Sequence, residues 1–181
     1  MVKVSEKAPV FSADAYLAGS AGDFVKVSSS DFKKKWIVLF FYPRDFTFVC
    51  PTEIKGFAKY EPEFKKLNAV VIGASTDSKF SHKAWFQRDM PEVKFPILAD
   101  TSLKIARDYG VLIEDSGDAL RGTFIIDPDG VLQYAVVSSL NVGRSIDETV
   151  RVLEALQTGG LCALNWKPGD ATLDGKKTAK K

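Results

Sequence analysis

The stretch Ile37-Val38-Leu39-Phe40-Phe41-Tyr42 is a continuous apolar run, rich in β-branched and aromatic residues. Such a run predicts a central strand buried on both faces, and Pro43 directly after it predicts where the strand ends. A second run of this kind covers residues 69–74 and is followed by the polar segment 75–78. The two runs predict buried strands of one sheet.

Shorter runs follow at residues 95–100 and 123–126. The latter leads through Asp127-Pro128-Asp129-Gly130, a strong turn signal, into the apolar residues 131–137. This pattern predicts a hairpin at one side of the sheet.

Helices are expected between these runs. From Pro51 to Leu67 the apolar residues recur every three or four positions, which predicts a helix with one buried face. Pro62 lies inside this pattern and should kink or divide the helix. Two further helices are expected over residues 78–88 and 102–109.

A fourth helix is marked by its start, where Ser145 and Glu148 have the spacing of a capping box. Strands that alternate with helices predict an α/β domain with a central mixed β-sheet flanked by helices. The periodic pattern ends after residues 158–160. We therefore expect one domain over residues 1–158 and a C-terminal arm over residues 159–181.

The composition is that of an ordinary globular protein: 181 residues, 45% hydrophobic, with a formal net charge of +2. Its one basic cluster, Lys176, Lys177, Lys180 and Lys181, is typical of a frayed terminus and not of a nucleic-acid interface. No apolar run predicts a membrane span or a signal peptide, so we expect a cytoplasmic protein. Two cysteines and one histidine exclude a Cys/His zinc site, but they leave open whether the thiols are inert or redox-active.

Cys50 stands between the central strand and the first predicted helix, and Pro51 follows it. Proline suits the first helical position, so Cys50 is predicted to be the N-cap residue. There its sulfur would face unpaired backbone N–H groups and the positive end of the helix dipole, which favour the thiolate. The alternative is a small buried hydrophobe. Thr47 and Pro43 favour a functional site, because a hydroxyl and a rigid wall would complete a pocket for a peroxide.

The segment from Phe41 to Glu53, Phe-Tyr-Pro-Arg-Asp-Phe-Thr-Phe-Val-Cys-Pro-Thr-Glu, resembles the active-site signature of peroxiredoxins. It is similar to the typical two-cysteine subgroup, which includes the peroxidase component of alkyl hydroperoxide reductase, and the likeness extends from Ala8 to about Thr172. The resemblance implies a thioredoxin-like fold. It also implies that Cys50 is a peroxidatic cysteine, whose thiolate attacks the peroxide O–O bond and becomes a sulfenic acid.

The same resemblance implies which groups stabilise the charge that develops on the peroxide oxygens. They are the hydroxyl of Thr47, backbone N–H groups near the sulfur, and the guanidinium of Arg121. Glu53 and Arg144 also match family positions near the site, although ordinary helix-end charges are an alternative for both. The implied peroxidase needs no metal and no cofactor, and its substrates would be hydrogen peroxide and small organic hydroperoxides.

Cys162, in the expected arm, resembles the resolving cysteine of the same subgroup, although Ala163 stands where the family usually has proline. It would attack the sulfenic acid of Cys50 in the partner subunit and form a disulfide. A thioredoxin or a dedicated flavoprotein disulfide reductase would reopen that disulfide. The resemblance further implies a homodimer or a decamer. An unreactive spare thiol is the alternative.

Two other functions compete with a peroxidase. A holdase chaperone or structural ring protein could use the same fold. A thiol–disulfide oxidoreductase is disfavoured because the chain has no Cys-x-x-Cys. His82, the only histidine, is expected to be a solvated residue on the surface of its helix, so a hydrolase with a Cys/His pair is also disfavoured.

Overall fold

The computed structural model describes residues 2–175, so the basic cluster at 176–181 lies outside the described residues. Two compact units are present: residues 1–144 and residues 145–181. The domain boundary at residue 158 stays a prediction. Within the described chain, no helix is long and apolar enough to cross a membrane.

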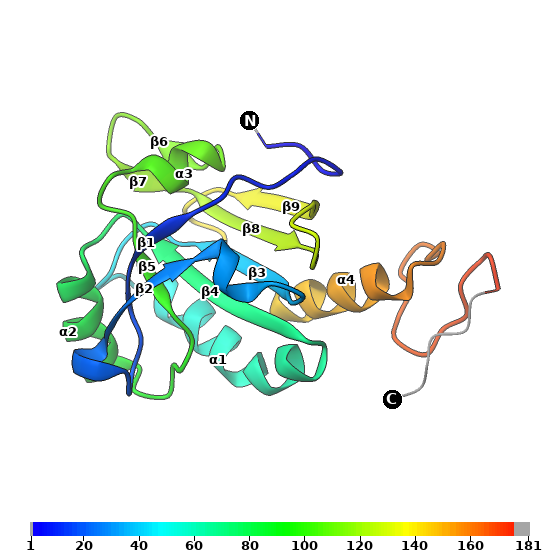
Figure 1. Cartoon of the computed structure of the whole chain (residues 1–181), viewed down its shortest axis with the longest axis horizontal. Helices are drawn as coiled ribbons and strands as arrows, with labels where there is room; N and C mark the ends of the chain where they lie inside the picture. The colour runs from blue at the N-terminus through cyan, green and yellow to red at the C-terminus, as the bar shows by residue number, and fades with distance from the viewer. Residues whose placement is uncertain (1, 176–181) are drawn as a thin grey trace. The chain divides into compact units, whose positions relative to one another are not determined.

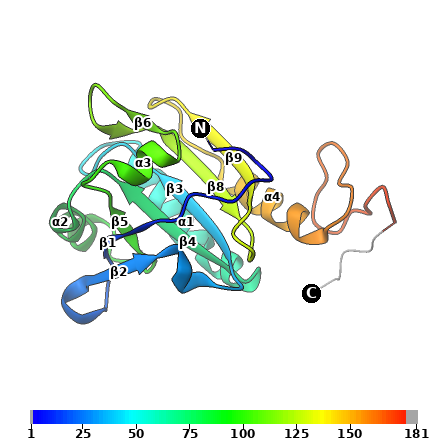
Figure 2. The same cartoon turned by 45° about the horizontal axis from the view of Figure 1, so that its top comes forward.

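A seven-stranded mixed sheet forms the centre of the first unit, with strand order β2-β1-β5-β4-β3-β8-β9 in the described residues. Its strands are β1 (Ser12–Tyr16), β2 (Phe24–Ser28), β3 (Trp36–Phe41), β4 (Ala69–Ser75), β5 (Ile97–Ala99), β8 (Arg121–Ile126) and β9 (Leu132–Ser138). The predicted central strand is β3, and the predicted hairpin is β8–β9 at one edge. The β1–β2 hairpin, which the apolar pattern did not predict, lies at the opposite edge (Figure 2).

Helices and short elements complete the first unit. They are α1 (Cys50–Lys66), α2 (Lys79–Asp89), α3 (Lys104–Asp108), the 3-10 helices at Ala21–Asp23 and Ser29–Phe32, and the small ladder β6 (Leu112–Ile113) with β7 (Asp118–Ala119). Figure 1 shows α1 and α3 on opposite faces of the sheet. Pro62 lies inside α1 and does not divide it, so of the two expected effects, a kink or a division, the division was wrong.

Side chains of β3 pack alternately on the two faces of the sheet, because successive residues of a strand point in opposite directions. Phe40 stacks on Phe57 of α1, with ring centroids 4.2 Å apart. Phe41, the next residue, contacts Tyr109 and Phe124 on the other face. A strand covered on both faces must be apolar throughout, which explains the uninterrupted run in the sequence.

Gly73 of β4 is required by this packing. A Cβ atom at this position would lie 2.9 Å from the ring of Phe40 and 2.8 Å from the side chain of Ile97, closer than packed atoms approach. The glycine therefore makes room for the aromatic ring that contacts α1.

The register of the sheet explains why residues far apart in the sequence meet at the end of the sheet where β3 and β4 finish. β3 and β4 are parallel, so their carboxyl ends lie together, and the loops that follow them are neighbours. β8 is antiparallel to β3, with Thr123 opposite Phe40, which places Arg121 near the carboxyl end of β3. Cys50 begins α1 just after the loop that leaves β3. The carboxyl end of β3 therefore carries the candidate site.

The second unit contains α4 (Ile146–Thr158), and its remaining described residues form neither helix nor strand. The side chain of Ser145 accepts a hydrogen bond from the Glu148 N–H, as the capping pattern predicts. Gly159 ends the helix at φ 62°, a left-handed conformation that suits glycine. The arm is closed on itself, because the Leu173 N–H donates to the Leu161 carbonyl.

Candidate active site

Cys50 is the first residue of α1 and its side chain is fully buried. The sequence predicted it as the N-cap, but the N-cap is Val49, which already has helical φ and ψ angles of −77° and −42°. The Val49 carbonyl accepts the first helical hydrogen bonds, from the N–H groups of Thr52 and Glu53. The predicted N-cap position was therefore wrong by one residue. Cys50 still lies in the first turn, at the positive end of the helix dipole.

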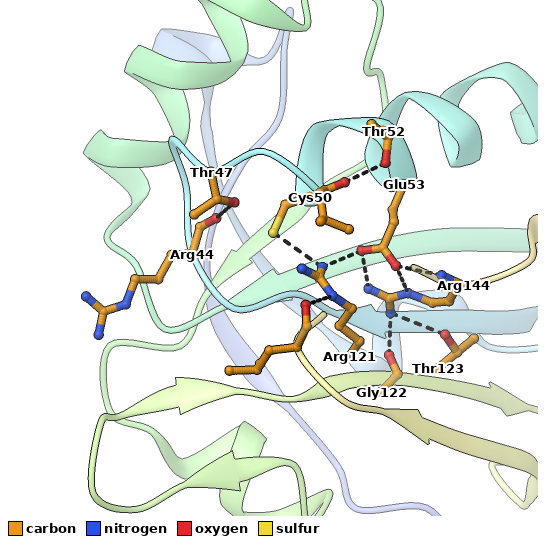
Figure 3. A network of polar contacts seen from close by, with 11 residues as sticks. Arg44, Thr47, Cys50, Thr52, Glu53, Arg121, Gly122, Thr123 and Arg144 are labelled. Atoms are coloured by element: carbon orange, nitrogen blue, oxygen red, sulfur yellow. Dashed lines mark hydrogen bonds and ion pairs between the residues drawn. The ribbon is translucent and has the colours of Figure 1, made fainter. Parts of the chain in front are cut away.

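Arg121, at the start of β8, brings a cation to the sulfur of Cys50. Its Nη1 lies 3.4 Å from the Cys50 Sγ and 2.6 Å from the Glu53 Oε2 (Figure 3). Its Nε donates to the Leu140 carbonyl, which fixes the plane of the guanidinium. The guanidinium is thus held by a carboxylate and a carbonyl while it points at the thiol.

A second arginine supports the same carboxylate. Arg144 donates from its backbone N–H and from Nε to the Glu53 Oε1, at 2.9 and 2.8 Å, and from Nη2 to Oε2 at 2.9 Å. Its Nη1 donates to the Gly122 carbonyl. The side chains of Glu53 and Arg144 are each only 3% exposed. Figure 3 shows the network passing from Cys50 through Arg121 and Glu53 to Arg144.

The charges of this buried cluster do not balance without the sulfur. Arg121 and Arg144 supply two positive charges and Glu53 supplies one negative charge. Buried charge is tolerated only when it is compensated. The arrangement therefore places a net positive charge beside the Cys50 sulfur. It also leaves a positively charged donor beside any oxygen that contacts the sulfur.

The pKa of Glu53 reflects the same balance. Burial alone would raise it, but hydrogen bonds from Arg144 and the charges of Arg144 and Arg121 lower the pKa below its ordinary value. Glu53 is therefore ionised at neutral pH and holds both guanidinium groups in place.

The loop between β3 and α1 supplies the other predicted site residues. Pro43 is buried and Thr47 is half-buried. The Thr47 hydroxyl donates to the Arg44 carbonyl at 3.0 Å, and its oxygen keeps lone pairs that can accept a hydrogen bond. Figure 3 shows Thr47 and Arg121 on different sides of Cys50.

Comparison with known proteins shows the family of this chain. The model of the AhpC/TSA family matches residues 4–135. The chain belongs to this family. A putative peroxiredoxin of Bacillus subtilis, YkuU, is 54% identical over 94% of this chain and 97% of its own length. A putative peroxiredoxin from the rubredoxin operon of Clostridium pasteurianum is 49% identical, over 94% of this chain and 98% of its own length.

Solved structures of peroxiredoxins share the fold of this chain. The reduced 2-Cys peroxiredoxin of Plasmodium vivax matches with a TM-score of 0.89 and 36% identity, covering 95% of this chain and 93% of its own. AhpC of Mycobacterium bovis matches with a TM-score of 0.83 and 39% identity, covering 92% and 99%. The protein is a thiol-dependent peroxidase with a thioredoxin-like fold, and its substrates are hydroperoxides. These relatives favour the peroxidase over the holdase interpretation.

Cys162 of this peroxiredoxin lies in the second unit and is half-buried. Its Sγ lies 3.5 Å from the Thr158 hydroxyl and 3.7 Å from the Ala155 carbonyl, and both are neutral groups. Both cysteines are free thiols. The part of the chain that the structure describes contains no group of three His, Cys, Asp or Glu side chains able to hold a metal ion.

The expectation that His82 is a solvated surface residue was wrong. Its side chain is completely buried, with Nδ1 2.8 Å from the Asp45 Oδ2 and Nε2 3.2 Å from the Leu98 carbonyl. A signal for this was present in the sequence: His82 precedes Trp85 and Phe86 by three and four residues, so all three share one helix face. Sequence reasoning also missed Asp45, the partner of this histidine.

Proposed function

We propose that Cys50 is the peroxidatic nucleophile of this thiol-dependent peroxidase. Its thiolate attacks one peroxide oxygen, an S–O bond forms, and the O–O bond breaks. The sulfur is oxidised by two electrons to a sulfenic acid, and the departing oxygen takes a proton and leaves as water or an alcohol. The observation that carries the proposal is the 3.4 Å contact between the Arg121 guanidinium and the Cys50 sulfur.

Arg121 stabilises the transition state, in which negative charge spreads over both oxygens, and the Thr47 oxygen orients the peroxide by accepting a hydrogen bond from its O–H group. Donors aimed at that charge accelerate the step more than donors that bind the peroxide itself. Arg121 is fixed by Glu53, and Glu53 is fixed by Arg144, so these two residues act through Arg121. Pro43 closes the loop side of the pocket and excludes water.

Cys162 of the partner subunit resolves the sulfenic acid. Its thiolate attacks the Cys50 sulfur, the S–O bond breaks, and a disulfide forms with release of water. Because Cys50 is fully buried in the first turn of α1, that turn must open before a second sulfur can reach it. A thioredoxin or a flavoprotein disulfide reductase then reduces the disulfide, in a cytoplasmic homodimer or decamer.

A non-reducing gel of peroxide-treated protein tests both cysteines. Wild type should shift to a disulfide-linked dimer, and Cys50→Ser and Cys162→Ser should each stay monomeric in the denaturing gel. Consumption of hydrogen peroxide in the presence of a thiol reductant should vanish in Cys50→Ser. Peroxide consumption by Cys50→Ser at the wild-type rate would contradict the assignment of the nucleophile. A dimer band in Cys162→Ser would contradict the assignment of the resolving residue.

A further inference from the structure

A strained turn precedes Cys50. Phe46 has φ 57°, a left-handed conformation that costs a bulky residue roughly 1–2 kcal/mol. It lies between Asp45 and Thr47, so the strain is located directly beside a proposed catalytic residue. A turn of this kind keeps its shape only when the surrounding structure holds it.

Asp45 holds the turn from the inside. Its carboxylate accepts hydrogen bonds from the Tyr42 hydroxyl at 2.8 Å and from the Ser81 hydroxyl at 2.7 Å, and it faces the Nδ1 of His82 at 2.8 Å. The residue is buried, and three different positions of the fold converge on one side chain: the end of β3 and two residues of α2. A buried carboxylate with three partners is rigidly placed.

The peptide group that precedes Asp45 makes hydrogen bonds to Thr47 on one side and to a second carboxylate, that of Asp77, on the other. The peptide between Arg44 and Asp45 is planar, so its C=O and N–H turn together. The C=O accepts the Thr47 hydroxyl at 3.0 Å, and the N–H donates to the Asp77 carboxylate at 2.9 Å. The orientation of this single plane therefore determines where the Thr47 oxygen lies.

We propose that Asp45 is a positioning residue for the peroxidase reaction: it holds the strained turn at Phe46 so that the Thr47 oxygen, whose hydrogen is donated to the Arg44 carbonyl, can accept a hydrogen bond from the peroxide. The proposal rests on the proposed function, in which Thr47 serves the peroxide. Asp45 itself does not touch the reacting atoms. The loop has an outer contact as well, an ion pair of Arg44 with Asp118, but the Arg44 side chain is 57% exposed and such pairs contribute little.

A double-mutant cycle tests this proposal, read out as the second-order rate constant for hydrogen peroxide in stopped flow. Asp45→Asn keeps the shape of the side chain but leaves one acceptor oxygen in place of two, and its rate should fall about 10-fold, because small displacements of catalytic groups are costly. Thr47→Val should lose about 100-fold, because it removes a hydrogen bond that orients the peroxide for attack. Since Asp45 acts through Thr47, the double variant should lie within about twofold of Thr47→Val.

Asp118→Asn is the matched control, because it loosens the outer contact of the same turn; it should retain the wild-type rate. If the two losses multiply to about 1,000-fold in the double variant, Asp45 acts independently of Thr47 and the proposal is overturned, as it is if Asp45→Asn reacts at the wild-type rate. Full activity of Thr47→Val would remove Thr47 from the proposed function and overturn this proposal with it, whereas an additive cycle overturns the Asp45 proposal alone.

Two milder variants keep the test valid if Asp45→Asn does not fold. Tyr42→Phe and Ser81→Ala each remove one donor to the carboxylate. Each should slow the reaction about two- to fivefold, and the loss should disappear when Thr47 is already valine. Wild-type rates for both variants would contradict the proposal.

Discussion

The two cysteines of this chain lie in opposite kinds of environment. Cys50 is fully buried at the start of α1, 3.4 Å from the guanidinium of Arg121. Cys162 is half-buried in the second unit, beside the hydroxyl of Thr158 and the carbonyl of Ala155. The first thiol contacts a fixed charged group, and the second contacts neutral groups in the last turn of α4.

This difference shows where the chain concentrates its electrostatic preorganisation. The groups around Cys50 come from β8, α1 and the segment before α4. The register of the sheet brings them together near the carboxyl end of β3. The groups around Cys162 are its own near neighbours in sequence. Under the proposed mechanism, reaction of Cys50 with a peroxide needs fixed donors, whereas Cys162 must be able to move in order to reach the oxidised sulfur. The variants below test this contrast.

Removal of the cation beside Cys50 should have the largest effect. Arg121→Met keeps the length of the side chain but deletes the donor, and we expect the rate constant with hydrogen peroxide to fall about 100- to 1,000-fold. Arg121→Lys keeps the positive charge but lacks the planar guanidinium, so its rate constant should lie between those of wild type and Arg121→Met. Stopped-flow fluorescence measures both. A wild-type rate for Arg121→Met would show that the charge beside Cys50 does not matter.

The same substitution at one carboxylate in each unit compares how much a buried and a half-exposed ion pair contribute to stability. Glu53→Gln leaves two buried guanidinium groups without their anion, and should lower the free energy of unfolding by about 3 kcal/mol. Glu148→Gln makes the same change on α4, where the carboxylate pairs with Arg151 in a half-exposed position, and should cost less than about 1 kcal/mol. Urea denaturation at neutral pH measures both. Equal losses would refute the distinction between a buried site and a solvated helix.

Cys50, Thr47 and Arg121 stand in short sequence motifs, and their catalytic roles stay predictions. The structure brings one of them, Arg121, to the Cys50 sulfur through the register of β3 with β8. The apolar run at residues 37–42 predicted the central strand because burial on both faces leaves a plain signal. The β1 strand, whose exposed and buried residues do not alternate cleanly, left none.

His82 shows which part of the surroundings could not be predicted. Its spacing to Trp85 and Phe86 indicates a buried helix face, but nothing local in the sequence identifies its polar partner Asp45, which lies 37 residues away. Long-range polar pairs carry no periodic signal. The one-residue error at Cys50 has a similar cause, since Val49 is helical although nothing in its side chain requires it.

Lowering the pH should reduce the difference in free energy of unfolding between wild type and Glu53→Gln. The pKa of Glu53 is lowered in the folded state, so its contribution to stability is complete above its ordinary value of 4.5 and is lost as the pH falls through the lower folded value. Urea titrations from about pH 6 to about pH 3 should show a steeper loss for wild type than for the variant. A gap that stays constant over this range would mean that Glu53 does not titrate as an ion pair.

The smallest effect is expected at the other thiol. In Cys162→Ser the fixed charges around Cys50 are unchanged, since Arg121, Glu53 and Arg144 all belong to the first unit. The first oxidation of Cys50 by hydrogen peroxide should therefore proceed within about twofold of the wild-type rate, because the transition-state donors remain. Only the later disulfide should be missing, so the sulfenic acid should persist and become trappable by dimedone. A first oxidation slowed as much as in Arg121→Met would mean that the second unit contributes to the reaction with peroxide. The two thiols would then not serve separate steps of the reaction.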